Sequence, residues 1–63
     1  MSIAMYQGED EHGLRIMISR TAIHAVEEIS ENECTIYFGD LPEFVVVTDS
    51  YENIHAFLCG GQD

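Results

Sequence analysis

Hydrophobic and polar residues alternate over much of this chain, and the spacing becomes helical near the C-terminus. The alternation is clear at residues 3–7 and 14–19, and the second segment places Ile16 and Ile18 on one face. The polar stretch 8–13 between them has a glycine at each end, which is typical of an exposed loop. The first 19 residues therefore predict an antiparallel hairpin with a wide acidic tip.

The stretch 21–30 has a different spacing. Ile23, Val26 and Ile29 recur at every third residue, which suits one face of a helix. A regular strand would instead place Glu27 on the same face as Ile23. The pattern therefore favours a short helix or an irregular connection in this stretch.

Two further strands are predicted in the second half of the chain. Residues 33–38 alternate, and a turn is expected at 39–42, where glycine and proline both occur. Residues 43–48 are rich in β-branched side chains. Because Val45 and Val47 would face away from Phe44, both faces of this strand are apolar. Such a strand is expected either at the centre of a sheet or in an interface.

A helix is predicted after the last strand. Asp49 is the expected N-cap, and Glu52 follows three residues later, as a capping box requires. The glycines at residues 60–61 are expected to end the helix in a left-handed conformation. One apolar stripe marks the face that should pack on the sheet: Tyr51, Ile54, Phe57 and Leu58. The expected fold is α+β, with an antiparallel sheet of about four strands and the helix packed on one face.

Length and composition are consistent with one folded domain over residues 1–63. Hydrophobic residues make up 46% of the chain, which is more than a disordered acidic tail would contain. A chain of this length is close to the lower limit for a core without disulfides or metals. The protein is therefore expected to be a monomer or a homodimer.

Charge is the most unusual property of the sequence. Twelve Asp and Glu residues stand against two basic residues, Arg15 and Arg20, and the formal net charge is −10. Direct binding to nucleic acid is not expected, because that affinity comes largely from Lys and Arg on phosphates. The negative field could keep the protein soluble, or it could steer the protein onto a positively charged partner.

The sequence predicts no catalytic site, metal site or cofactor. Two cysteines, Cys34 and Cys59, lack C-x-x-C spacing and are expected as reduced residues at or near the core. No two histidines stand at i, i+4, and the acidic loop around His12 lacks the alternation of a calcium loop. No glycine-rich phosphate loop is present, so a non-enzymatic protein is expected.

The acidic residues are the candidate partner-binding surface. They fall into three groups along the chain, and the hypothesis requires these groups to share a face and imitate spaced phosphates. The residues chosen for this surface are Glu9, Asp10, Glu11, Glu27, Glu28, Glu31, Glu33, Asp40 and Glu43. Asp49 and Glu52 belong to the third group, and a set of unconnected solvated turns is the alternative explanation.

In length, α+β pattern and excess of acidic residues, the chain resembles the small acidic phage proteins that mimic DNA. Among these it is similar in kind to the anti-CRISPR proteins, with those directed at type I effector complexes as the suggested subgroup. The resemblance implies a stoichiometric inhibitor that occupies a basic DNA channel or PAM-reading site. The expected partner is then a basic nucleic-acid-binding protein or complex, in this case a CRISPR effector.

A second resemblance implies a different function. Residues 23–58 look like small bacterial adaptor or regulatory modules, including the flagellar FlbD-like proteins. In that case Tyr37, Val45 and Val47 would form an apolar protein interface. No stretch approaches the ~20 apolar residues of a membrane span, and no signal peptide is visible. The expected location is the cytoplasm, either of the encoding cell or of an infected host.

Overall fold

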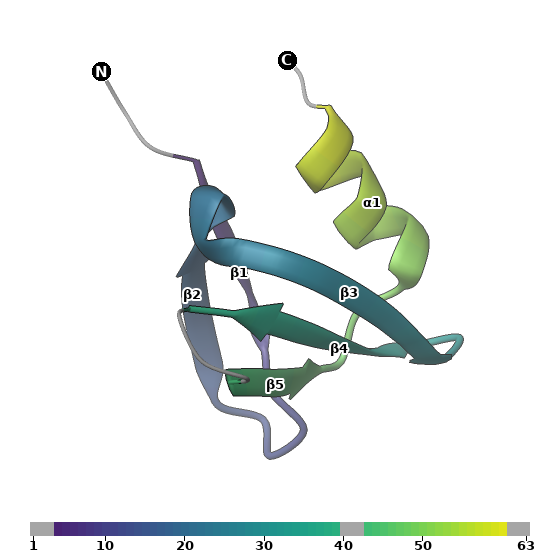
Figure 1. Ribbon diagram of the computed structural model, residues 1–63. Coiled ribbons are helices and arrows are strands. Elements are labelled where there is room, and N and C mark those ends of the chain that lie inside the picture. Colours follow the sequence, from purple (N-terminus) through teal and green to yellow (C-terminus); the bar gives the residue numbers. More distant parts are fainter. Residues whose placement is uncertain (1–3, 40–42, 61–63) are drawn as a thin grey trace.

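The computed structural model describes residues 4–39 and 43–60. It is an α+β fold built from antiparallel strands, a short 3₁₀ helix and a C-terminal α-helix (Figure 1). The expected class is therefore confirmed. Residues 40–42 of the expected turn, and Gly61 of the expected helix end, lie outside the described residues.

An antiparallel hairpin forms as predicted, but its first strand ends two residues later than expected, so Gly8 and Glu9 belong to the strand and not to the loop. Residue 3 of the predicted strand lies outside the described residues. Strands β1 (Met5–Glu9) and β2 (Arg15–Ser19) pair antiparallel, with Tyr6 opposite Ile18. Both of these side chains are buried. The loop between the strands contains Gly13 at a φ of 81°, in the left-handed region where glycine is favoured.

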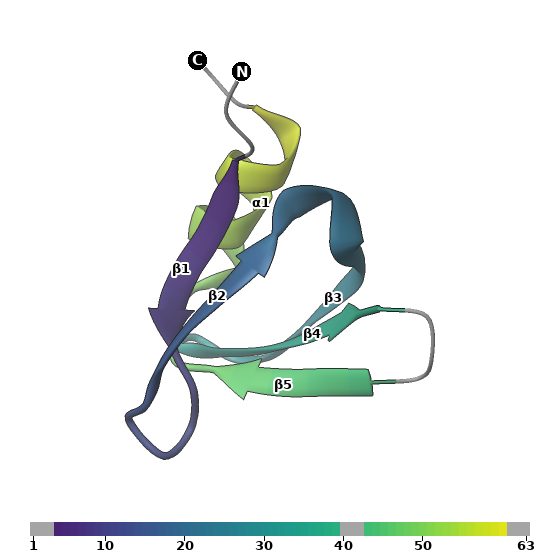
Figure 2. The ribbon, with the colours of Figure 1, turned by 90° about the vertical axis from the view of Figure 1, so that its left-hand side faces the viewer.

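The strands form two sheets, which corrects the expectation of about four strands in one. One sheet contains β1 and β2. The other has the order β3–β4–β5, with β3 at Ile23–Ser30, β4 at Glu33–Phe38 and β5 at Glu43–Val47. The 3₁₀ helix η1 (Arg20–Ala22) turns the chain from one sheet into the other. The hairpin consequently crosses the second sheet at a wide angle (Figure 2).

The prediction of a helix or irregular connection at 21–30 was wrong for most of that stretch, which is strand β3. Ile23 pairs with Phe38, but Ala25 pairs with Tyr37, so His24 is an extra residue. A β-bulge of this kind reverses the alternation of the strand beyond it. Ile23 and Val26 therefore both pack against the core although they are three residues apart.

Strand β5 is not central, since it pairs only with β4 among the strands of its sheet. The valines that were expected to face outward and form an interface instead face the core. Val47 is fully buried and Val45 packs against the core, whereas Phe44 is 60% exposed. Register explains this outcome, because Phe44 lies opposite Tyr37 and Val45 lies opposite the buried Ile36.

The helix α1 spans Tyr51–Cys59. Its N-cap is Ser50 and not Asp49, since the Ser50 hydroxyl accepts a hydrogen bond from the Asn53 amide at 3.2 Å. The C-cap residue Gly60 has a φ of −134°, so the expected left-handed ending is not seen at this residue. Ile54 is fully buried, while Tyr51 is only at the margin of the packed face.

The core lies between the two sheets and is closed on one side by α1. The helix contacts both sheets: it packs beside β3, and Phe57 meets the ring of Tyr6 edge-on at 5.9 Å between centroids. A backbone hydrogen bond also joins the end of β1 to the chain just after β5, from the Thr48 amide to the Glu9 carbonyl at 2.9 Å. The buried core residues are Tyr6, Ile18, Cys34, Ile36, Val47 and Ile54.

Candidate functional site

The carboxylate of Asp49 connects β1 to the start of α1. It accepts hydrogen bonds from the Tyr6 hydroxyl at 2.8 Å, from the Ser50 amide at 2.8 Å and from the Asn53 side chain at 3.0 Å. Burial, and then the hydrogen bond and charge of Asp49, raise the pKa of Tyr6 well above its ordinary value. Asp49 therefore has a structural role, and it fixes where the neighbouring acidic residues lie.

Three acidic groups that are separate in the sequence meet at one end of the three-stranded sheet. A single row crosses this end: Asp10 bridges to Val47, Val47 pairs with Cys34, and Cys34 pairs with Glu28. Neighbouring strands lie about 4.8 Å apart, so the row is roughly 14 Å wide. Figure 1 shows the β3–β4 turn and the chain entering α1 at this end.

We call this region the acidic end. It combines the loop after β1, the β3–β4 hairpin and the start of α1. Its carboxylates are Glu9, Asp10, Glu11, Glu27, Glu28, Glu31, Glu33, Asp49 and Glu52. Of the sequence-predicted surface, Glu43 lies at the opposite end of β5, paired with Phe38, and Asp40 lies outside the described residues.

The members of the acidic end differ in their roles. The Asp10 carboxylate accepts hydrogen bonds from the amides of His12 and Leu14, both at 2.9 Å, so it shapes the loop. Glu27 accepts a 2.7 Å hydrogen bond from the Tyr37 hydroxyl. Glu28 and Glu31 are exposed, and their carboxylates have no hydrogen bond or ion pair within the described residues.

The buried thiol of Cys34 lies beneath this charge. Burial raises its pKa, and the charges of Glu28, Asp49 and Glu52 raise it further. The same thiol donates to the Asp49 carbonyl at 3.5 Å. Carboxylates from the second and third sequence groups therefore both raise the pKa of the same thiol.

The outer face of the three-stranded sheet carries an aromatic pair. Tyr37 and Phe44 are register partners with ring centroids 5.9 Å apart. Glu27 adjoins this pair through the Tyr37 hydroxyl. The apolar interface expected from Tyr37, Val45 and Val47 is therefore corrected: the outward side chains are Tyr37, Phe44 and Val46, because both other valines face the core.

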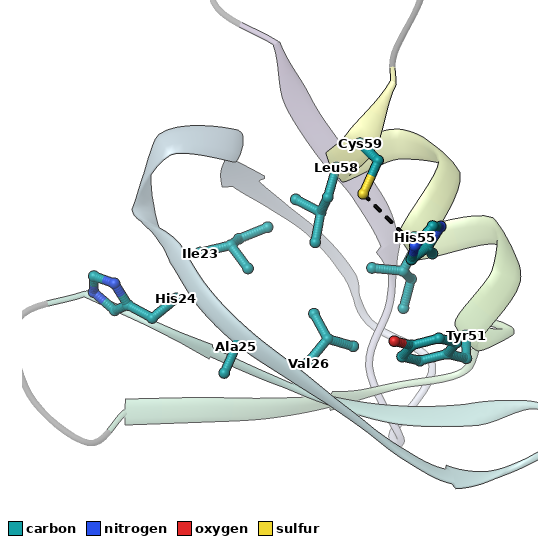
Figure 3. A pocket seen from close by; sticks show the side chains of 9 residues that line it. Ile23, His24, Ala25, Val26, Tyr51, His55, Leu58 and Cys59 are labelled. Carbon is teal, nitrogen blue, oxygen red and sulfur yellow. Dashed lines mark hydrogen bonds between the residues drawn. The ribbon is translucent and has the colours of Figure 1, made fainter.

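A groove of about 230 Å³ lies between β3 and α1. Ile23, Val26 and Leu58 form its apolar floor, and His55 and Cys59 stand on its helical side (Figure 3). The His55 Nε2 and the Cys59 Sγ are 3.7 Å apart. Cys59 is exposed, which corrects the expectation that both cysteines lie at or near the core.

Sequence reasoning missed the pairing of His55 with Cys59. The signal was available, because the predicted helix placed both residues on one face at i, i+4 spacing. A pair of one histidine and one cysteine matches neither the spacing of two histidines at i, i+4 nor the C-x-x-C motif.

Few charges are compensated in the structure. Across residues 4–39 and 43–60, the only contact of this kind is between the Glu11 carboxylate and the His12 ring, at 3.8 Å, and it is an ion pair only when His12 is protonated. No group of three or more His, Cys, Asp or Glu residues in the same ranges is arranged to hold a metal ion. No helix in the described part of the chain is long and apolar enough to cross a membrane.

Comparison with known proteins gives no relative on which to base a function. No family model, no curated protein and no solved structure matches the chain.

Proposed function

We propose that this chain is a non-enzymatic inhibitor whose acidic end binds the basic, nucleic-acid-binding surface of a protein or complex. One observation carries the proposal: carboxylates from three separate segments gather at one end of a small sheet. From Thr21 onward the sequence has no Lys or Arg, so β3, β4, β5 and α1 contribute no basic side chain beyond their histidines.

The charge density of the acidic end is suited to mimicry of DNA. Duplex DNA carries one charge per ~1.7 Å, so about eight charges fall within the roughly 14 Å width of the row. This number is close to the nine carboxylates of the acidic end as a whole, of which those of Asp10 and Glu28 stand in the row itself. The proposed partner is therefore a surface that normally binds duplex DNA, such as the channel or PAM-reading site of a CRISPR effector.

The mode of action follows from this charge. A bound acidic end would occupy Lys and Arg side chains that otherwise neutralise phosphates, so inhibition would be stoichiometric and competitive with duplex DNA. The association would also be salt-sensitive, because the Debye length is only ~8 Å at physiological ionic strength.

The first test is capture from a nuclease-treated bacterial lysate by the tagged full chain, followed by competition with duplex DNA. The triple variant Glu27→Lys, Glu28→Lys, Glu31→Lys should lose binding, and the wild-type complex should dissociate as salt is raised. Glu43→Lys is the control, since this exposed residue is at the opposite end of β5 and its reversal should leave binding nearly unchanged.

Two results would contradict the proposal. One is a triple variant that binds as tightly as the wild type. The other is a captured partner that survives high salt and does not compete with duplex DNA.

A second candidate function is an adaptor that binds a protein partner through the outer sheet face. The observation that favours it is the exposure of Phe44, which is 60% accessible beside Tyr37. An apolar interface responds little to salt, so this function predicts a salt-resistant complex that is lost in Phe44→Thr. Phe44 is outside the core cluster, so that variant should keep the fold.

A further inference from the structure

Two good ligands for a divalent transition metal lie together at the C-terminal end of α1. His55 and Cys59 are four residues apart on the helix, so their side chains share one face. Both are exposed, and Cys59 is a free thiol. Figure 3 shows the two side chains pointing toward each other above the groove.

The spacing of the two donor atoms fits tetrahedral zinc. Zinc binds thiolate sulfur at about 2.3 Å and imidazole nitrogen at about 2.0–2.1 Å. At a tetrahedral angle these bond lengths place the sulfur and the nitrogen roughly 3.6 Å apart. The observed distance between the His55 Nε2 and the Cys59 Sγ is 3.7 Å. A zinc ion could therefore bind both atoms with little movement of either side chain.

The surroundings also favour a cation at this place. The last carbonyl groups of a helix carry a partial negative charge, and Cys59 is the final residue of α1. The nearest Lys or Arg in the sequence is Arg20, which lies in η1 and outside the lining of this groove, whereas His24 belongs to that lining. The net charge of −10 further attracts divalent ions.

The chain supplies only part of a zinc site by itself. No third His, Cys, Asp or Glu in the described residues joins the pair, whereas structural zinc is almost always four-coordinate. A second copy related by a two-fold axis would bring the same two ligands, which completes a Cys₂His₂ set. We propose that His55 and Cys59 form a zinc half-site, and that two copies of the chain share one zinc ion.

The test uses the full chain, reduced and at physiological salt, where repulsion between two acidic copies is screened. Cobalt(II) is the probe, because tetrahedral cobalt absorbs visible light and its bond to thiolate gives a near-ultraviolet band. We expect saturation at one cobalt per two chains. Sedimentation should show a dimer with cobalt or zinc and a monomer after a chelator is added.

Variants assign the ligands. Cys59→Ser and His55→Gln should each lose the cobalt–thiolate band and the metal-dependent dimer while keeping the far-ultraviolet circular dichroism of the wild type. His12→Gln is the matched control, since this histidine is in the exposed loop between β1 and β2, and it should behave as the wild type.

Four results would overturn the proposal. The band could be absent, or it could persist in Cys59→Ser and so belong to Cys34. Cobalt could also saturate at one per chain without a change in mass. A dimer that resists the chelator would equally contradict a shared zinc ion.

Discussion

Removing one oxygen atom from Tyr6 should cost this protein a large part of its stability. Tyr6 is 4% exposed, and its hydroxyl donates to the Asp49 carboxylate at 2.8 Å. A hydrogen bond to a charged group contributes about 1.5–3 kcal/mol. At roughly 0.05–0.15 kcal/mol per residue, a chain of this length has on the order of 3–9 kcal/mol in total. Tyr6→Phe should therefore remove at least about a sixth of the stability, and about half if the total is near the middle of this range and the bond near its upper value.

Urea unfolding at pH 7, followed by circular dichroism, measures this loss. Urea is preferred to guanidinium because it adds no ions that would screen the acidic end. A loss of 1.5–3 kcal/mol corresponds to a fall in Tm of roughly 6–24 °C for a domain this small.

Tyr37→Phe is the matched control, because the Tyr37 hydroxyl also donates to a carboxylate, Glu27, at 2.7 Å, but does so at the surface. Water replaces that bond, so the control should be close to the wild type. If both variants lose the same stability, the role assigned to Asp49 as a partly buried connection between β1 and α1 is wrong.

The hydrogen bond of Tyr6 also predicts that the stability of the wild type depends on pH more steeply than that of Tyr6→Phe. The pKa of Tyr6 is raised in the folded state above its ordinary value of 10.0. The folded protein therefore keeps the Tyr6 proton at a pH where the unfolded chain releases it. The stability contributed by the Tyr6 hydroxyl is fully present below pH 10 and is lost as the pH rises above 10. Wild-type protein should therefore lose more stability than Tyr6→Phe between pH 9 and pH 11. An equal loss in the two proteins would contradict the assignment.

Three further predictions concern packing. A Cβ at Gly8 would lie 2.6 Å from the Tyr6 hydroxyl oxygen, so Gly8→Ala should disturb the same hydrogen bond and lower the Tm, and an unchanged Tm would refute the close approach. Ile54→Ala should cost about 2–5 kcal/mol because Ile54 is fully buried. Phe57→Ala should cost less than about 3 kcal/mol, because Phe57 is only partly buried beside the core and not fully buried. Urea unfolding ranks the two, and the reverse order would contradict this packing of α1.

The strands that follow simple alternation were predictable, whereas the one that breaks alternation was not. Residues 15–19 and 33–38 keep one pattern throughout, and both formed as expected. In β3 the extra residue His24 places core-facing side chains three residues apart, at Ile23 and Val26, in place of the usual two. From the sequence alone, that spacing cannot be distinguished from a helical face. The bulge is held in the structure by a hydrogen bond from the His24 ring to the Gly39 carbonyl, a contact between distant residues.

The acidic residues could be listed from the sequence, but their grouping could not. Glu43 and Asp49 are close in the sequence and were therefore assigned to one group, although they lie at opposite ends of β5. Glu28 and Asp49 are distant in the sequence and were assigned to different groups, although the charges of both residues raise the pKa of Cys34. Only the pairing of β3, β4 and β5 brings those residues together, and pairing depends on a register that the bulge alters.

This grouping also separates acids that support the fold from acids that oppose it. Asp10 and Asp49 accept structural hydrogen bonds, and Glu52 lies in the first turn of α1, where the helix dipole stabilises it. Glu28 and Glu31 receive no such support within the described residues, so their charges mainly repel their neighbours.

Replacing Glu27, Glu28 and Glu31 with lysine should therefore have opposite effects on binding and on stability. Binding to a basic partner should be lost, whereas the Tm at low salt should rise because repulsion between uncompensated carboxylates is removed. The gain should shrink as salt is added. A variant that fails to bind and is also less stable than the wild type would point to a damaged fold. Loss of binding with a higher Tm would instead mean that these carboxylates are retained for a partner at a cost to stability.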